Sequence, residues 1–447
     1  MPEAAVPKTD VSTLPAARPR SIFRLSALGP GIVYTLTVLG SGDIVSNAAA
    51  GAGYGYALIW ALGLTLVFRY VWVNTSAKYV LVTGESLIQG YGRLGTWVIW
   101  IVLISGAVIR HLYNLYKIVM MGSAADLLFH LPTQLSTAIW ALLFVLVGFG
   151  MMFWGGYPVI EIVFKVLIAA MGGSLIVAAL LAHPDPAGII RGTFIPTVPG
   201  QSGIYSALFV LMALIGTEAG SMTNLTYPYF MYEKGWRHIS YLKQQRWDLA
   251  VGVSCIFLMG ALLQIAAAGT VRPLGISLKT ADDLVKIFTK TQGLVGLIVF
   301  GLGLWGASFS SFVGATTGYS MIATDIFRSF IPRFKRPLDR ENKEEAIKKD
   351  PIYRWAVVIF TFSPIYIVFT GVKPVWLTLM VSSLVVVAIP VLAVSLLIIT
   401  NRKSLMGAYR NGWFTNLVMI VLVLISVYFT YRNGIDLWKE FIGIFHR

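Results

Sequence analysis

The chain has 447 residues, of which 57% are hydrophobic and only 12% charged, and its mean hydropathy is +0.74. A soluble domain carries roughly a quarter charged residues, so this composition excludes a soluble globular protein and indicates an integral membrane protein. The net charge of +15 does not indicate nucleic-acid binding, because the basic residues lie in loops between apolar segments, as membrane orientation requires. With Cys255 as the single cysteine, no intrachain disulfide can form.

Residues 1–27 contain prolines and charges but no apolar core, so we interpret them as a cytoplasmic tail rather than a cleaved signal peptide. Apolar runs of about 20 residues match a lipid core of about 30 Å. Such runs recur along the chain and predict eleven transmembrane helices, beginning near residues 30, 56, 95, 135, 158, 203, 249, 293, 352, 374 and 413. The expected fold class is an all-α polytopic membrane protein.

The loops between these helices predict the orientation. Lys and Arg concentrate in three loops, EKGWRHISYLKQQRW, RSFIPRFKRPLDRENKEEAIKKDPIYR and NRKSLMGAYRNG, which share one side of the membrane. Cytoplasmic loops carry such an excess. We therefore expect a cytoplasmic N-terminus and an outer C-terminus, in the bacterial inner membrane. One basic loop, VRPLGISLKTADDLVKIFTK, falls on the outer side and is outweighed by the other three.

Two predicted helices are interrupted in the same way, the first at LGSGDIVSN (39–47) and the sixth at IGTEAGSMTN (215–224). Each interruption places glycines around an acidic residue, and glycine weakens a helix by up to about 1 kcal/mol relative to alanine. Corresponding breaks five helices apart predict two five-helix repeats, and because five is odd the second repeat is inverted. We expect a transporter core at 28–400, with repeats at about 28–182 and 202–400, and then a loop and an eleventh helix at 401–447.

The acidic residues at the breaks, Asp43 and Glu218, are the candidate functional groups. Unwound backbone at membrane depth is stable only where protein or a water-filled cavity satisfies it, so both carboxylates should enter a cavity. Two carboxylates that meet repel unless a proton or a cation lies between them, and a divalent cation fits. Oxygen donors at the breaks complete the predicted metal site: Gly40, Ser41, Ser221, Thr223 and Asn224. Ser46, Asn47 and the carbonyls of Thr217 and Ala219 lie nearby.

A structural interpretation of the two acids is also open. Asp43 could cap the N-terminus of a half-helix. Glu218 could pair with a basic residue such as Arg110 or Lys117. The hydroxyl and amide side chains nearby are individually common in helix packing.

Several longer stretches resemble the natural resistance-associated macrophage proteins (NRAMP), which are divalent transition-metal transporters. GYGYALIWALGL followed by SAKYVLVTGESL resembles the family's second helix, LGLWGASFSSFVGATTGY its eighth, and KPVWLTLMVSSLVVVAIPVLAVSLLIITNRKSLMG its tenth. HPDPAGIIRGTFIPTVP is similar to the loop before its sixth helix. The resemblance runs from about residue 29 to 407 and implies a leucine-transporter-type fold.

The metal-site motifs depart from the family pattern. Where family members have Asp-Pro-Gly-Asn in the first break, this chain has Gly40-Ser41-Gly42-Asp43. In the sixth break, Glu218 and Ser221 stand where the resemblance places an Ala carbonyl and a Met thioether, and Thr223 replaces a His. Met222 would restore the thioether only if the register shifted by one residue. The resemblance thus implies a site of oxygen ligands.

The third helix of the family carries acidic residues that relay protons, and the matching positions here are Asn114 and Lys117. The resemblance therefore implies that this relay is lost. His111 could still carry protons, although a lone His on a helix is more often a hydrogen-bonded structural residue.

Oxygen ligands suit Mg²⁺ and Mn²⁺, and Mg²⁺ keeps several of its waters. This chemistry and the resemblance to the NRAMP-related magnesium transporter branch predict a transporter of hydrated divalent ions, mainly Mg²⁺ and also Mn²⁺, without proton coupling. Two alternatives remain: a proton-coupled Mn²⁺ or Fe²⁺ importer of ordinary NRAMP type, and an amino-acid or organic-cation transporter on the same fold. We expect no enzymatic activity, no resident cofactor and no nucleic-acid partner; the oligomeric state is not predicted.

Overall fold

The computed structural model describes residues 40–154, 157–200, 203–219, 222–336 and 343–445, and within these ranges the chain is helical without a strand. The predicted tail and the start of the first predicted helix lie outside the described residues. The α-helices are α2 (Ser41–Tyr54), α3 (Ile59–Thr83), α4 (Leu87–Gly92), α5 (Thr96–Leu128), α6 (Ser136–Trp154), α7 (Tyr157–Leu181), α8 (Pro186–Phe194), α9 (Ala207–Leu214), α10 (Tyr227–Glu233), α11 (Leu242–Thr270), α12 (Ala281–Phe330), α13 (Lys343–Lys348), α14 (Pro351–Phe362), α15 (Pro374–Val385), α16 (Ile389–Asn401), α17 (Lys403–Met406) and α18 (Trp413–Phe445).

Eight segments of the described chain are long and apolar enough to cross a membrane, and α7 with α8 forms a ninth if that pair, bent by 117°, counts as one span. These nine correspond to the predicted helices from residue 95 onward. The remaining two are α3, which is 25 residues long but interrupted by polar residues, and the first predicted helix, of which α2 is the described part. Gly293, with φ of 57°, breaks α12 at the predicted start of the eighth helix.

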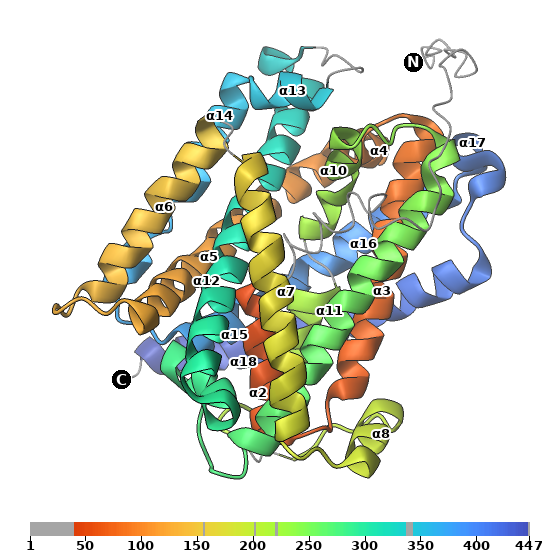
Figure 1. Cartoon of the computed structure of the whole chain (residues 1–447). Helices are drawn as coiled ribbons and strands as arrows, with labels where there is room; N and C mark the ends of the chain where they lie inside the picture. The colour runs from red at the N-terminus through yellow and green to blue at the C-terminus, as the bar shows by residue number, and fades with distance from the viewer. Residues whose placement is uncertain (1–39, 155–156, 201–202, 220–221, 337–342, 446–447) are drawn as a thin grey trace.

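The half-helix α2 lies inside the bundle rather than at its surface. It packs against α11, α9, α15 and α12, and 12 of its 14 residues are buried. In Figure 1, α2 lies behind α7 and beside α11, with α5 and α12 on one side and α3 on the other. A helix that is buried all round belongs to the core, so the sequence of α2 places its polar residues at the centre of the protein.

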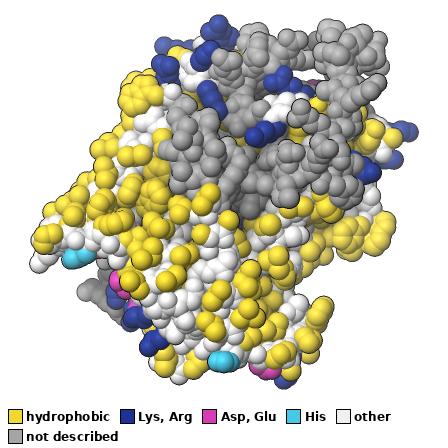
Figure 2. Space-filling view, viewed as in Figure 1, with side chains coloured by type: hydrophobic (Ala, Val, Ile, Leu, Met, Phe, Trp, Pro, Cys, Tyr) yellow, Lys and Arg dark blue, Asp and Glu magenta, His cyan; other side chains and the backbone are white. Residues whose placement is uncertain are grey.

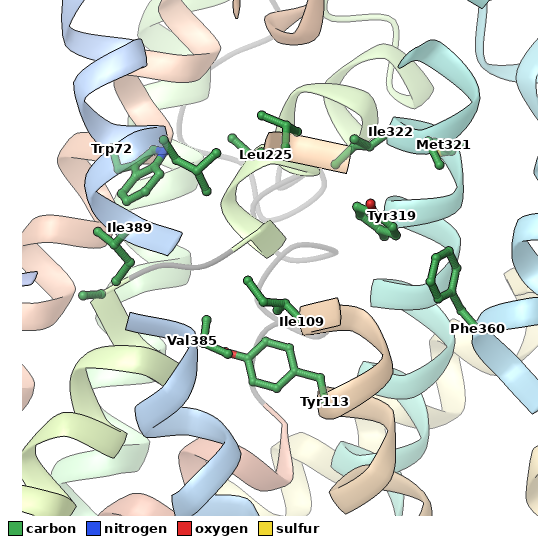
Figure 3. Close-up of a cluster of buried hydrophobic side chains, with 14 of the residues drawn as sticks. Trp72, Ile109, Tyr113, Leu225, Tyr319, Met321, Ile322, Phe360, Val385 and Ile389 are labelled. Carbon is green, nitrogen blue, oxygen red and sulfur yellow. The ribbon is translucent and has the colours of Figure 1, made fainter. Parts of the chain in front are cut away.

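A large apolar cluster holds α5 against its neighbours. Figure 3 shows Tyr113 of α5 facing Val385 of α15, and Tyr319 of α12 facing Phe360 of α14. The rings of Tyr319 and Phe360 meet edge to face with centroids 5.1 Å apart, a contact worth about 0.5–1.5 kcal/mol beyond its buried area. In the same cluster, α5 packs against α12 and α15, which orients its polar side chains.

Candidate metal site

The first break is the N-terminus of α2, as predicted. Gly40 is the N-cap residue, and its backbone N–H donates to Oδ2 of Asp43 at 2.9 Å. An acidic residue in the first turn also interacts favourably with the helix dipole. The second carboxylate oxygen, Oδ1, is buried and has no hydrogen-bond partner among the described residues. Asp43 therefore supports the N-terminus of α2 with one oxygen, while the other has no partner among the described residues.

The second break lies in the sixth predicted helix, also as predicted. After α9 ends at Leu214, one turn of π-helix, η3, covers Ile215–Ala219, and the described chain resumes as the 3₁₀ turn η4 (Met222–Leu225). Single π turns inside helices occur frequently at functional sites. Gly216 makes this turn possible, because a Cβ at that position would lie 1.7 Å from the carbonyl oxygen of Ser382.

The two breaks meet at the centre of the bundle. Asn47 of α2 donates from Nδ2 to Oε1 of Glu218 at 3.0 Å, and the hydroxyls of Ser46 and Thr217 are 3.3 Å apart. Gly42 permits this close crossing, since a Cβ there would lie 3.0 Å from the methyl group of Thr217. Asp43 and Glu218 line the same small cavity at this crossing. The two breaks therefore place both acids at one cavity, and their role as metal ligands stays a prediction.

Glu218 also forms a buried ion pair, but not with either predicted partner. Nη1 of Arg69 in α3 lies 3.4 Å from Oε2 of Glu218, and Nη2 donates to the carbonyl oxygen of Thr217. Lys117 instead donates to the carbonyl and hydroxyl oxygens of Ser311 at 3.2 and 2.6 Å. Arg110 donates to Asn114. The suggested pairing of Glu218 with Arg110 or Lys117 is therefore wrong, because α5 directs these cations towards Ser311 and Asn114.

Arg69 was not among the predicted partners of Glu218, although the sequence contains a signal for it. Arg69 lies in the middle of the apolar second helix and is 1% exposed. A charge at such a position requires a partner or a cavity. Gln264 of α11 was missed as well: its Nε2 donates to Oδ1 of Asn47 at 2.8 Å, while its Oε1 has no partner among the described residues.

The remaining predicted ligands are distributed unequally around the breaks. The hydroxyl of Ser41 is buried without a hydrogen-bond partner in the described part of the chain. Asn224 is buried and donates from Nδ2 to the carbonyl of Ala219 at 3.4 Å, so its amide stabilises the break. Thr223 is half-buried. Ser221, like Gly220, lies outside the described residues, and so does the side chain of Met222.

The proposed relay positions on α5 form a structural network. The Asn114 amide donates to Thr316 at 3.1 Å and to the Phe360 carbonyl at 2.7 Å. His111 lies beside hydroxyl groups, with Nδ1 2.9 Å from Ser363 and Nε2 3.3 Å from Tyr366. No carboxylate forms a hydrogen bond or ion pair with Asn114 or Lys117 in the contacts of the described residues.

A small cavity borders the two acids. It is lined by Asp43, Asn47 and Glu218 on one side and by apolar residues that include Met171 and Met259 on the other. The volume that the centres of water molecules can occupy in this cavity is about 10 Å³, which is enough for roughly one water. The described residues contain no group of three or more His, Cys, Asp or Glu that could hold a metal. A divalent ion here would have to combine two carboxylates with neutral donors and water.

Buried carboxylates where α2 meets a break in the sixth predicted helix are typical of secondary transporters. The chain is a member of the natural resistance-associated macrophage protein-like family, whose sequence model matches residues 31–435. It is 24% identical over 416 residues to the divalent metal cation transporter MntH of Yersinia pestis (strain Pestoides F), covering 92% of this chain and 95% of that protein. MntH of Caldanaerobacter subterraneus is also 24% identical, with 94% of each chain covered.

Solved structures establish the fold. The Eremococcus coleocola manganese transporter, in complex with an aromatic bis-isothiourea substituted compound, aligns with a TM-score of 0.68 at 17% identity, covering 90% of this chain and 86% of the other. MhsT in complex with L-phenylalanine aligns with a TM-score of 0.58 at 14% identity, covering 91% and 98%. The chain therefore has the leucine-transporter-type fold, as expected.

Proposed function

We propose that the chain carries hydrated divalent metal ions, Mg²⁺ and Mn²⁺, by alternating access and without proton coupling. The observation that supports this most directly is the meeting of Asp43 and Glu218 at the crossing of α2 and η3, beside one cavity. One buried oxygen of Asp43 has no partner in the described part of the chain. A doubly charged cation is the simplest substrate that gains energy from both carboxylates.

The ligand chemistry supports hard ions. Apart from the guanidinium of Arg69, the polar groups around the acids are amides, hydroxyls and carbonyls, from Asn47, Gln264 and Thr217. Oxygen ligands suit Mg²⁺ and Mn²⁺, and Mg²⁺ keeps several waters in place of protein ligands. Because the described cavity holds about one water, a hydrated ion would need the more open conformations of the transport cycle.

The lack of an acidic relay on α5 supports transport without protons. Asn114 cannot exchange a proton at neutral pH, and its amide is held by hydrogen bonds to α12 and α14. Lys117 is held by Ser311. His111 lies at the edge of this network, beside Ser363 and Tyr366, which is the position of a structural residue.

A proton-coupled Mn²⁺ importer is the second candidate. The relatives named divalent metal cation transporter, and the related manganese transporter structure, favour it. So do the side chains of Met171 and Met259, which line the cavity, because a thioether is a soft ligand that favours transition metals over Mg²⁺. An amino-acid or organic-cation transporter is supported only by the shared fold.

Uptake into liposomes with a pH-sensitive dye trapped inside separates these candidates. We expect Mg²⁺ and Mn²⁺ to be transported, to compete with each other, and to leave the internal pH unchanged. Cd²⁺ transport that Mg²⁺ does not inhibit, with stoichiometric internal acidification, would establish the second candidate instead. Inhibition of Mn²⁺ uptake by amino acids would indicate the third.

We propose, further, that the N-terminus is cytoplasmic and that the bacterial inner membrane is the location. Figure 2 shows Lys and Arg side chains concentrated at the end of the molecule that carries α13 and α17, with a smaller group at the opposite end. The positive-inside rule makes the first end cytoplasmic. The proposed repeats, 28–182 and 202–400, remain as predicted from the breaks.

A further inference from the structure

A carrier that moves a divalent ion without protons must also return empty across the membrane. Its two carboxylates are then buried without the ion that neutralised them, and an uncompensated buried charge is costly. Something else has to supply positive charge in that step. In this structure both acids are buried, Glu218 completely. A cation on a separate helix, α3, contacts Glu218.

Arg69 is that cation. Its Nη1 lies 3.4 Å from Glu218, and its Nη2 donates to the Thr217 carbonyl, so one side chain occupies both a carboxylate and a carbonyl that a metal at this crossing would use. Its charge also acts on Asp43. Lys117, the other buried cation near Asp43, is hydrogen-bonded to Ser311. Arg69 is therefore the cation placed to compete with a substrate ion.

Arg69 is held by Thr217 through Nη2, but its contact with the carboxylate of Glu218 is long. A charge-assisted N–H···O contact is typically about 2.7–2.9 Å long, shorter than the 3.4 Å found here. Nε of Arg69 has no partner among the described residues, so the planar guanidinium is not fully bonded. Glu218 is held independently through Oε1 by Asn47, which is itself held by Gln264. The carboxylate would thus keep its position if Arg69 moved away.

We propose that Arg69 is the resident counter-ion of Glu218: the substrate ion displaces it on binding, and it returns to Glu218 when the ion leaves. This inference rests on the proposed transport of divalent ions. In a proton-coupled transporter a proton neutralises the empty site. Here the guanidinium of Arg69, which is tethered to α3, would neutralise it instead. It also makes Arg69 a determinant of metal affinity, because the ion and Arg69 exclude each other from the same oxygen.

The test compares Arg69→Met, which removes the charge, with Arg69→Lys, which keeps it, in proteoliposomes clamped at zero potential. Net uptake of radioactive Mn²⁺ into metal-free vesicles requires the empty carrier to return, whereas exchange against internal Mn²⁺ does not. Arg69→Met should lower the ratio of net uptake to exchange about tenfold. The same variant should bind Mn²⁺ about tenfold more tightly in calorimetry, within the usual range for two coupled ligands.

Arg110→Met is the matched control, because it removes another buried guanidinium that contacts Asn114 and not Glu218. It should leave the ratio of net uptake to exchange unchanged, as should Arg69→Lys. If Arg69→Met does not fold, Arg69→Gln keeps a donor for the Thr217 carbonyl and is measured in its place.

If Arg69 is purely structural, its replacement should reduce net uptake and exchange together without tightening Mn²⁺ binding, and that result overturns the inference alone. A wild-type protein that neither binds nor exchanges Mn²⁺ or Mg²⁺ overturns the proposed function, and the inference with it.

Discussion

Replacing Glu218 by alanine should destabilise the protein, because the guanidinium of Arg69 would stay buried without its carboxylate. The charges are 3.4 Å apart, and both side chains are almost completely buried. At an effective dielectric constant of about 20, Coulomb's law gives an attraction of about 5 kcal/mol before desolvation. Breaking one partner of a buried ion pair costs about 3–5 kcal/mol. These two values agree.

The loss should be visible in thermal unfolding in detergent. Average unfolding entropies, scaled to 447 residues, convert 1 kcal/mol into about 1 °C, so Tm should fall by about 3–5 °C. Transport of Mg²⁺ should be lost in the same variant, and Glu218→Gln should be nearly as damaging to transport. The double variant Glu218→Ala with Arg69→Met removes both charges and should recover most of the Tm. A single variant with an unchanged Tm, or a double variant that melts as low as the single one, would refute the ion-pair argument.

Three further predictions concern the breaks and the α5 network. Gly216→Ala should abolish folding or lower Tm severely, since its Cβ would lie 1.7 Å from a backbone oxygen. Gly172→Ala, which has open space around the new methyl group, should be neutral or slightly stabilising. Equal melting of the two variants would contradict the packing at η3. Asp43→Asn removes the charge but keeps an oxygen for the helix cap, so Mg²⁺ uptake should fall at least about tenfold while Tm changes little. Asp43→Ala should add the loss of the cap, about 0.5–2 kcal/mol. Normal uptake by Asp43→Asn would remove this carboxylate from the site. His111→Ala should cost about 1 kcal/mol of stability by removing side-chain hydrogen bonds and should leave Mn²⁺ uptake insensitive to an imposed pH gradient, which a trapped pH dye checks directly.

The sequence alone determined the membrane character, most helix positions and the two breaks, because hydrophobic runs and glycines act locally along the chain. It also predicted that Asp43 and Glu218 would meet, since equivalent breaks in two repeats lie at one pseudo-symmetric crossing.

Only the tertiary structure decided which groups surround the acids. Arg69 and Glu218 are 149 residues apart, and their contact depends on the rotation of α3 about its axis, which packing against the neighbouring helices sets. The same holds for Gln264 beside Asn47 and for the methionines that line the cavity. On α5 the sequence offered two cations as partners for Glu218, and the packing of that helix against α12 directed Lys117 to Ser311 instead. A local pattern specifies that a buried charge needs a partner, whereas the arrangement of the helices specifies which one it finds.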